Sequence, residues 1–327
     1  RRLHLLKVHR PYHESDHVLN LAYNALCDGI RLEDIELRRN DEVFLDALGT
    51  ERIPDPTTAG DFCRRFSEPD IRALMAAVDD ARLNVWARQP KEFFERATID
   101  MDGTLVITTG ECKQGMDISY KGTWGYHPLV VTLAETGEVL RVVNRSGNRP
   151  SHEGAAHEAD EAIGLCRKAG FRQIVLRGDT AFSQSGKLDA WDRQGVTFYF
   201  GFKALPNLEE IADGLPKTAW RKVLRPPRYE VKTDPRQKPV NVKQRVVRRR
   251  EFEVLRLKDE EYAEFEYQPA ECGQPYRMVV VRKVIAHEQG SGGCSTRSAT
   301  FSTSPTIGRS TRRRSCSRPM TAAIRKT

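Results

Sequence analysis

The chain has 327 residues, of which 39% are hydrophobic, so it is long enough for one large domain or two ordinary ones. It contains no apolar run of about eighteen residues, which excludes a membrane-spanning helix, and no charged-then-apolar start of the kind that directs export. The net charge of +8 suggests a nucleic-acid partner, but residues 291–327 carry eight basic side chains and no acidic one. Residues 1–290 therefore hold 45 basic and 45 acidic side chains, and affinity for DNA has to come from local patches.

Residues 1–95 are expected to form a helical N-terminal region. Apolar residues recur at helical spacing over residues 18–26, with Ser15 as the expected N-cap. A second helix is expected over residues 32–48 and a third over residues 71–86. Pro54 and Pro56 are expected to break the chain between them.

The pattern changes at residue 96, where the first part of an α/β core is expected to begin and to extend to residue 224. Strands are expected at residues 97–106, 127–133, 138–144, 173–176 and 196–202, and helices at residues 153–169 and 185–194. Three adjacent strands followed by helix–strand alternation predict an α/β fold, a mixed sheet with flanking helices in the order of RNase H-like folds. Residues 225–290 contain β-rich, strongly charged segments at 228–231, 245–257, 264–267 and 276–284, which we interpret as a β-rich insertion and a return to the core.

Two acidic sites stand at the ends of expected apolar strands. The first holds Asp100 and Asp102, which face the same side if residues 97–106 are extended, and the second holds Asp179. Carboxylates on adjacent strands can hold two Mg²⁺ or Mn²⁺ ions roughly 4 Å apart, which clamp the attacking and leaving oxygens of a phosphodiester. For either site alone, an aspartate that caps a turn is the other interpretation.

Several motifs together resemble the bacterial insertion-sequence transposases of the DDE class, specifically the thirteen-eighty group. They are D-G-T at 102–104, G-D-T-A-F at 178–182, H-R-P-Y-H-E-S-D-H-V-L-N at 9–20, R-I-P-D-P-T-T-A-G-D-F-C-R-R-F at 52–66, Y-H-P-L-V-V at 126–131 and N-R-S-G-N-R-P-S-H-E-G-A at 144–155. The resemblance covers about residues 9–290.

The resemblance implies a metal-dependent enzyme of DNA transposition and recombination. It places the first two catalytic, metal-binding acids on Asp102 and Asp179, with Asp100 as a near neighbour that is not excluded. A metal-activated water would cut one strand at an element end, and the freed 3′-hydroxyl would attack a second phosphodiester. The implied partners are double-stranded DNA, as terminal inverted repeats and target DNA, and a second copy of the chain, in a cytoplasmic, nucleoid-associated setting.

Eight further residues are candidates for DNA contact, because basic groups neutralise phosphates and exposed aromatic rings stack on unpaired bases. The alternatives are solvated surface for the basic residues and loop packing for the aromatic ones. They are Arg177, Lys113, Trp124, Tyr126, Arg245, Arg248, Arg249 and Arg250.

Two other functions remain open. The string D-M-D-G-T-L at 100–105 is also similar to the first motif of haloacid-dehalogenase-type phosphatases, in which Asp100 would be the nucleophile and Asp102 the general acid. That family needs an acid shortly after its late Gly-Asp, and here none follows Asp179 before Asp189. A non-catalytic DNA-binding remnant of a transposase is the second alternative.

The third acid that the resemblance implies is a Glu on a helix beyond the β-rich insertion and one more strand. Residues 291–327 contain no Glu or Asp, so they cannot supply it. Their composition changes abruptly at Ser291, which predicts a basic, disordered tail. A frameshift near residue 291 accounts for this change, because an offset frame over residues 293–307 permits the strand-like L-F-D-E-I-R-Y-F-L-Y-I-T-N-D-R. The same offset over residues 318–327 permits A-N-D-R-C-N-Q-E-N. The chain is thus expected to be a defective transposase.

Overall fold

The computed structural model of the chain describes residues 3–7, 11–110, 113–224, 253–289, 294–295 and 303–308. Residues 253–258, 285–289, 294–295 and 303–308 are described by their backbone alone. The chain divides into two compact units, Arg1–Pro90 and Lys91–Thr327. Among the described residues, no helix has the length and apolar character needed to cross a lipid bilayer.

The first unit is helical. Its elements are α1 (Glu14–Leu26), the 3₁₀ helix η1 (Leu32–Asp34), α2 (Ile35–Arg39), α3 (Glu42–Leu48), α4 (Pro56–Cys63) and α5 (Glu68–Trp86). A small core of Ile35, Ile53 and Ala59 joins η1, α2 and α4, and Phe62 stacks on His17 of α1 with ring centroids 4.4 Å apart.

Three expectations for this unit are corrected. The N-cap of α1 is His13, not Ser15. The helix expected over residues 32–48 is divided, because the Asp41 side chain accepts a hydrogen bond from the Phe44 backbone and starts a new helix there. Pro56 was expected only to break the chain, but it begins the helix α4, since proline lacks an N–H that the first turn leaves unpaired anyway, and Asp55 caps this turn.

The second unit is built on one long mixed sheet. Its helices are η2 (Lys91–Glu95), α6 (Ala155–Ala169), η3 (Thr180–Phe182), α7 (Ser185–Arg193), α8 (Pro206–Asp213) and η4 (Lys217–Ala219). Its strands are β1 (Arg96–Gly103), β2 (Val106–Ile107), β3 (Asp117–Ile118), β4 (Trp124–Tyr126), β5 (Leu129–Leu133), β6 (Glu138–Val143), β7 (Gln173–Gly178), β8 (Thr197–Gly201), β9 (Arg221–Lys222), β10 (Glu253–Tyr267), β11 (Tyr276–Gln289), β12 (Cys294–Ser295) and β13 (Thr303–Gly308).

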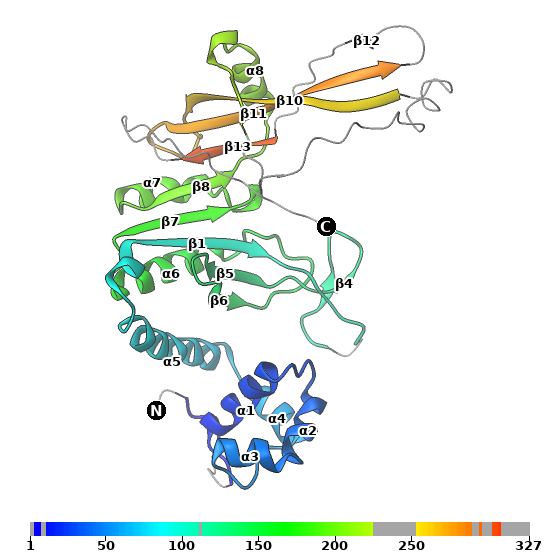
Figure 1. Ribbon diagram of the computed structural model, residues 1–327, viewed down its shortest axis with the longest axis vertical. Coiled ribbons are helices and arrows are strands. Elements are labelled where there is room, and N and C mark those ends of the chain that lie inside the picture. The colour runs from blue at the N-terminus through cyan, green and yellow to red at the C-terminus, as the bar shows by residue number, and fades with distance from the viewer. Residues whose placement is uncertain are drawn as a thin grey trace, which may run out of the picture. The chain divides into compact units, whose positions relative to one another are not determined.

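The strand order of this sheet is β6-β5-β1-β7-β8-β13-β11-β10-β9, and Figure 1 shows β6 to β11 in that order. Strand β5 is antiparallel to both of its neighbours, β1 and β6, whereas β7 is parallel to β1 and β8 is parallel to β7. Each parallel connection runs through a helix, α6 before β7 and α7 before β8, as crossovers require. The predicted α/β class with a mixed sheet and flanking helices is confirmed.

The two faces of the five strands β6-β5-β1-β7-β8 differ in burial. One face is a close-packed core, in which Ile99 lies in register with Leu133 and Leu176, and all three are fully buried. Helix α6 packs on strands β1, β5, β6 and β7, and Trp191 of α7 packs on Phe200 of β8 with ring centroids 5.8 Å apart.

The opposite face is partly open toward the carboxyl ends of β1 and β7. One row of residues in register across this face consists of Val142, Val130 and Asp102. The adjacent row holds Val139, Thr132, Asp100, Arg177 and Tyr199. Val139 and Val142 are each 46% exposed, which is unusual for valines in the sheet of a packed core. The acidic residues of the first predicted site therefore lie on the less covered face.

The β-rich insertion is continuous with the core sheet. Strands β10 and β11 form a long antiparallel hairpin, and β13 joins β11 to β8. Within the tail at residues 291–327, which was expected to be disordered, the structure describes the strands β12 and β13, and the other residues of this tail lie outside the described residues. Strand pairing uses backbone groups that every sequence carries, so a segment without an apolar pattern can still fill a gap between two strands. The register of β13 against β11 shifts between Val279 and Val281, at the level of Pro305, as expected for a residue that has no N–H to donate.

Candidate functional site

Two acidic residues lie at the carboxyl ends of the neighbouring strands β1 and β7. Asp102 is the last residue but one of β1, and Asp179 follows directly after β7. Met101 pairs with Gly178 in the parallel register, so the next pair along the two strands is Asp102 and Asp179. Adjacent strands lie about 4.8 Å apart, and both side chains are exposed. The structure thus places the two predicted acids at the ends of neighbouring parallel strands.

Asp100 takes a different role from Asp102. Its two carboxylate oxygens accept hydrogen bonds from Arg177, at 2.6 Å from Nε and 2.6 Å from Nη2. This bidentate pair joins β1 to β7, and the hydrogen bond with Asp100 raises the pKa of Arg177. Both oxygens of Asp100 are occupied, so it contributes less readily than Asp102 to a metal site.

The turn that presents Asp179 is packed tightly against its neighbours. The Asp179 side chain accepts from the Ala181 backbone at 2.8 Å and so caps the short helix η3. A Cβ added at Gly201 of β8 would lie 2.8 Å from the backbone nitrogen of Thr180, and one at Gly178 would lie 2.8 Å from Cβ of Phe182. Both glycines therefore allow a close approach that fixes the position of the turn. From the sequence, we treated a turn-capping aspartate and a site aspartate at a strand end as alternatives. Asp179 both caps a turn and lies at the end of a strand.

A half-buried arginine, Arg145, supports the end of β1, and the sequence analysis did not single it out. Arg145 donates from Nε to the carbonyl of His127 at 3.0 Å, and from Nη1 to the carbonyls of Ser151 at 3.0 Å and Glu153 at 2.7 Å. Burial lowers its pKa. His127 in turn packs against Gly103, where an added Cβ would lie 2.6 Å from its Nε2. Arg145 thus holds the loop beside Asp102, and its only sequence signal was its place in the motif at 144–155.

His127 is buried and donates from Nδ1 to the carbonyl of Arg149 at 2.9 Å, because a carbonyl can only accept. Its backbone nitrogen donates to the carbonyl of Arg145 at 2.8 Å. These contacts give His127 a structural role in the loop.

The side chains at the strand ends are of the type that binds a divalent metal, but they are too few for a two-metal site. Mg²⁺ and Mn²⁺ prefer carboxylate oxygens, which Asp102 and Asp179 supply. A two-metal site needs further ligands to bridge and flank the ions. Within the ranges that the structure describes, no group of three or more His, Cys, Asp or Glu side chains comes together. The described residues therefore do not complete a two-metal site.

The other predicted DNA contacts are placed in part. Trp124 is 51% exposed on β4, beside Ile118 in the three-stranded sheet β2-β4-β3. Tyr126 is half-buried and donates its hydroxyl proton to the carbonyl of Gln114 at 2.7 Å, so it packs against a loop. Lys113 is exposed and donates to Oγ1 of Thr108 at 2.6 Å. Four predicted contacts lie outside the described residues: Arg245, Arg248, Arg249 and Arg250.

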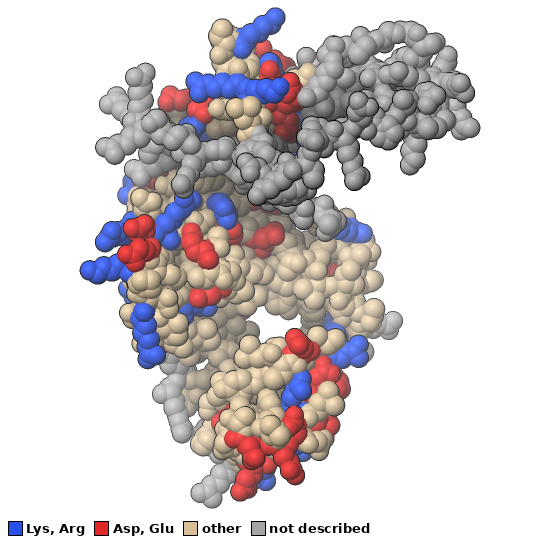
Figure 2. Space-filling view, viewed as in Figure 1, with Lys and Arg blue, Asp and Glu red and all other residues tan. Residues whose placement is uncertain are grey.

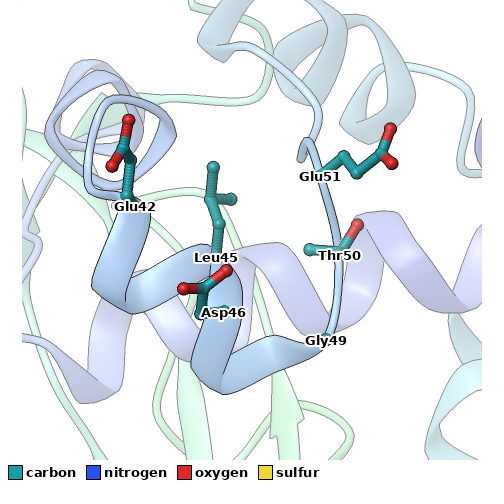
Figure 3. A pocket seen from close by; sticks show the side chains of 6 residues that line it. All are labelled: Glu42, Leu45, Asp46, Gly49, Thr50 and Glu51. Carbon is teal, nitrogen blue, oxygen red and sulfur yellow. The ribbon is translucent and has the colours of Figure 1, made fainter.

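One segment of the first unit is strongly acidic. Residues 28–61 hold ten acidic and four basic side chains, and Figure 2 shows acidic groups gathered over the helices of this unit. An open depression of about 390 Å³ lies here, lined by Glu42, Leu45, Asp46, Gly49, Thr50 and Glu51. Figure 3 shows Glu42 and Asp46 on α3, and Thr50 and Glu51 on the segment that follows. Three carboxylates repel a phosphate backbone, so this depression is not a DNA site.

Comparison with known proteins gives the family. Over residues 7–294 the chain matches the family described as transposase DDE domain group 1, and it therefore belongs to that family. The match ends within a few residues of Ser291.

Among solved structures, the chain is similar to a piggyBac transposase, determined by cryo-EM in a synaptic complex with hairpin DNA. The two share 11% identity with a TM-score of 0.34, over 82% of this chain and 54% of that one. The chain thus spans about half the length of that transposase. No curated protein matches the chain.

Proposed function

We propose that the chain is the catalytic core of an insertion-sequence transposase of the thirteen-eighty group, which cleaves and joins DNA at element ends. One observation carries the proposal. Met101 and Gly178 pair on the parallel strands β1 and β7, and the two acids expected from the resemblance, Asp102 and Asp179, come directly after them. Two carboxylates at this spacing can share a Mg²⁺ or Mn²⁺ ion, and family membership supports DNA as the substrate. Joining two element ends requires two active sites at once, which favours a homodimer.

We further propose that the chain as written is defective because its reading frame is shifted near residue 291. The family match stops at residue 294, and residues 291–327 contain no Asp or Glu that could serve as the third acid. Strand β13 occupies the position between β8 and β11 with a segment that includes Pro305, a poor residue for a strand paired on both sides. The open face with Val139 and Val142 is also consistent with a missing covering element.

The test compares two chains on the DNA that flanks the gene. One is the chain as written, and the other carries the offset frame from residue 291 onward. With Mg²⁺ present, we expect strand cleavage at the element ends by the restored chain alone, and its loss in Asp102→Asn and Asp179→Asn. Cleavage by the chain as written would overturn the defect, and a restored chain that never cleaves would overturn the assignment. A gene whose codons do not permit L-F-D-E and N-Q-E-N in the offset frame would exclude the frameshift.

A non-catalytic DNA-binding remnant is the second candidate, and the pair of acids without a described third one favours it. In that case Asp102→Asn should keep DNA affinity or increase it, because a negative charge near phosphate is removed. The phosphatase alternative has no support from the geometry. It needs Asp100 as a free nucleophile, whereas Arg177 holds both of its oxygens.

A further inference from the structure

The ion pair between Asp100 and Arg177 is bidentate, and it lies on the same two strands as the candidate site. Exposed ion pairs usually contribute little to stability, so stability alone gives weak reason for a bidentate pair at this point. The pair joins the same two strands as the Asp102–Asp179 site and precedes it by two residues on each strand. Two residues of strand span about 6.6 Å, so the guanidinium lies close to the carboxylates on the open face.

Arg177 keeps hydrogen-bonding capacity beyond this pair. A guanidinium has five N–H groups, and the two bonds to Asp100 use one on Nε and one on Nη2. Among the residues that the structure describes, Asp100 is the one hydrogen-bond and salt-bridge partner of Arg177, with a longer-range attraction from Glu135, and the Arg177 side chain is 48% exposed. Three N–H groups therefore remain for an incoming acceptor, and Asp100 fixes the plane in which they lie.

An anionic acceptor is the one that suits this place. Asp102 and Asp179 repel a DNA phosphate unless positive charge lies close by, and Asp100 would add a third negative charge. Pairing with Arg177 cancels the charge of Asp100 and leaves a fork that matches phosphate oxygens. The arrangement resembles neither a solvated arginine, which would be free to rotate, nor a buried structural pair, because both side chains are accessible.

We propose that Asp100 and Arg177 form a preset phosphate clamp. Asp100 is a positioning residue, and Arg177 binds a backbone phosphate next to the one held at Asp102 and Asp179. The inference rests on the proposed function, since it takes DNA as the ligand. It also removes Asp100 from the metal ligands and gives it a different task in the same site.

The experiment measures how the full-length chain binds a fluorescent duplex of about 40 base pairs of mixed sequence, between about 50 and 200 mM KCl. For Arg177→Ala we expect the slope of log affinity against log salt to fall by about 0.9, the value of one lost phosphate contact. At fixed salt, affinity should fall about five- to tenfold. Arg177→Lys keeps the charge but loses the fork, so its slope should stay near that of the unmodified chain while its affinity falls about threefold.

The variant Asp100→Asn distinguishes two effects of Asp100 on DNA affinity, its negative charge and its orientation of the Arg177 guanidinium. Charge alone predicts tighter DNA binding, because one negative group is removed. The clamp predicts binding about two- to threefold weaker, because the guanidinium loses its fixed plane.

The hairpin offers a matched control pair. Arg277 of β11 binds Glu264 of β10 in the same bidentate way, at 3.0 Å from Nε and 2.5 Å from Nη2, with side chains 46% and 41% exposed. Glu264→Gln removes the same charge as Asp100→Asn, and Arg277→Lys makes the same change as Arg177→Lys.

The clamp is supported if Arg177→Ala lowers the salt slope and Asp100→Asn binds more weakly than Glu264→Gln. It is overturned if the slope is unchanged in Arg177→Ala, or if Asp100→Asn binds as tightly as Glu264→Gln or more tightly. Failure of the unmodified chain to bind DNA at any of these salt concentrations would overturn the proposed function and the clamp together. Binding by the unmodified chain with unchanged variants would overturn the clamp alone.

Discussion

The contact between the β10–β11 hairpin and α7 gives the sharpest prediction for stability. Tyr276, 1% exposed, donates its hydroxyl proton to Oδ1 of Asp189 at 2.5 Å and accepts from Nε2 of Gln274 at 3.1 Å. The backbone N–H of Gly273 donates to the other oxygen of Asp189 at 2.7 Å. A polar contact thus ties the turn of the hairpin to a helix of the core, on a path that does not involve β13.

Replacing Tyr276 with Phe removes one hydrogen bond to a charged acceptor. Such bonds contribute about 1.5–3 kcal/mol, and we expect the lower part of this range because Asp189 keeps Gly273 and is partly open to water. The free energy of unfolding should therefore fall by about 1.5–2 kcal/mol. For a unit of this size, the melting temperature should fall by about 3–8 °C.

The assay is urea and thermal unfolding followed by circular dichroism, with Tyr267→Phe as the matched control. Tyr267 pairs with Tyr276 across the hairpin, and within the described part of the chain its hydroxyl has one contact, a neutral hydrogen bond accepted from Nδ2 of Asn207 at 3.3 Å. Its loss should cost about 0.5 kcal/mol or less. A double-mutant cycle of Tyr276→Phe with Asp189→Ala should give a coupling energy above about 1 kcal/mol. Equal costs for Tyr276→Phe and Tyr267→Phe would refute the reasoning.

Two further predictions concern the same unit. Gly201→Ala should lower the free energy of unfolding by about 1–3 kcal/mol in urea titrations, because its Cβ would press on the backbone of Thr180. Gly164→Ala in α6, where nothing lies within 4 Å, should be neutral or stabilise by up to about 1 kcal/mol, and the reverse ranking would contradict the packing argument. The hydrogen bonds from Tyr276 and Gly273 lower the pKa of Asp189 below 3.8, so its charged form favours the folded state. That stabilisation is complete above about pH 5 and is lost as the pH falls through the lowered folded-state pKa. Tyr276→Phe should reduce this acid sensitivity, and an unchanged pH profile would argue against the contact.

Much of the site could be derived from local sequence. An apolar run that ends in Asp100-x-Asp102, and another that ends in Gly178-Asp179, already place carboxylates at strand ends. Two-residue periodicity and turn residues are local properties, so the strands, α6 and α7 follow from short stretches of chain. Three features were not predicted from the sequence. They are the division of the helix at Asp41, the start of α4 at Pro56, and the strands of two or three residues around Trp124, which are too short to show a period.

Only the tertiary structure decided which residues far apart in sequence are in contact. The sequence by itself placed three aspartates at strand ends, and the family resemblance favoured Asp102 without excluding Asp100. Their difference arises because the parallel register sets Asp100 against Arg177, 77 residues away, and sets Asp102 beside Asp179. Register is a property of the assembled sheet, so no local pattern contains it. The same holds for β13, where the sheet recruits a segment of the tail through backbone hydrogen bonds that do not depend on side-chain type.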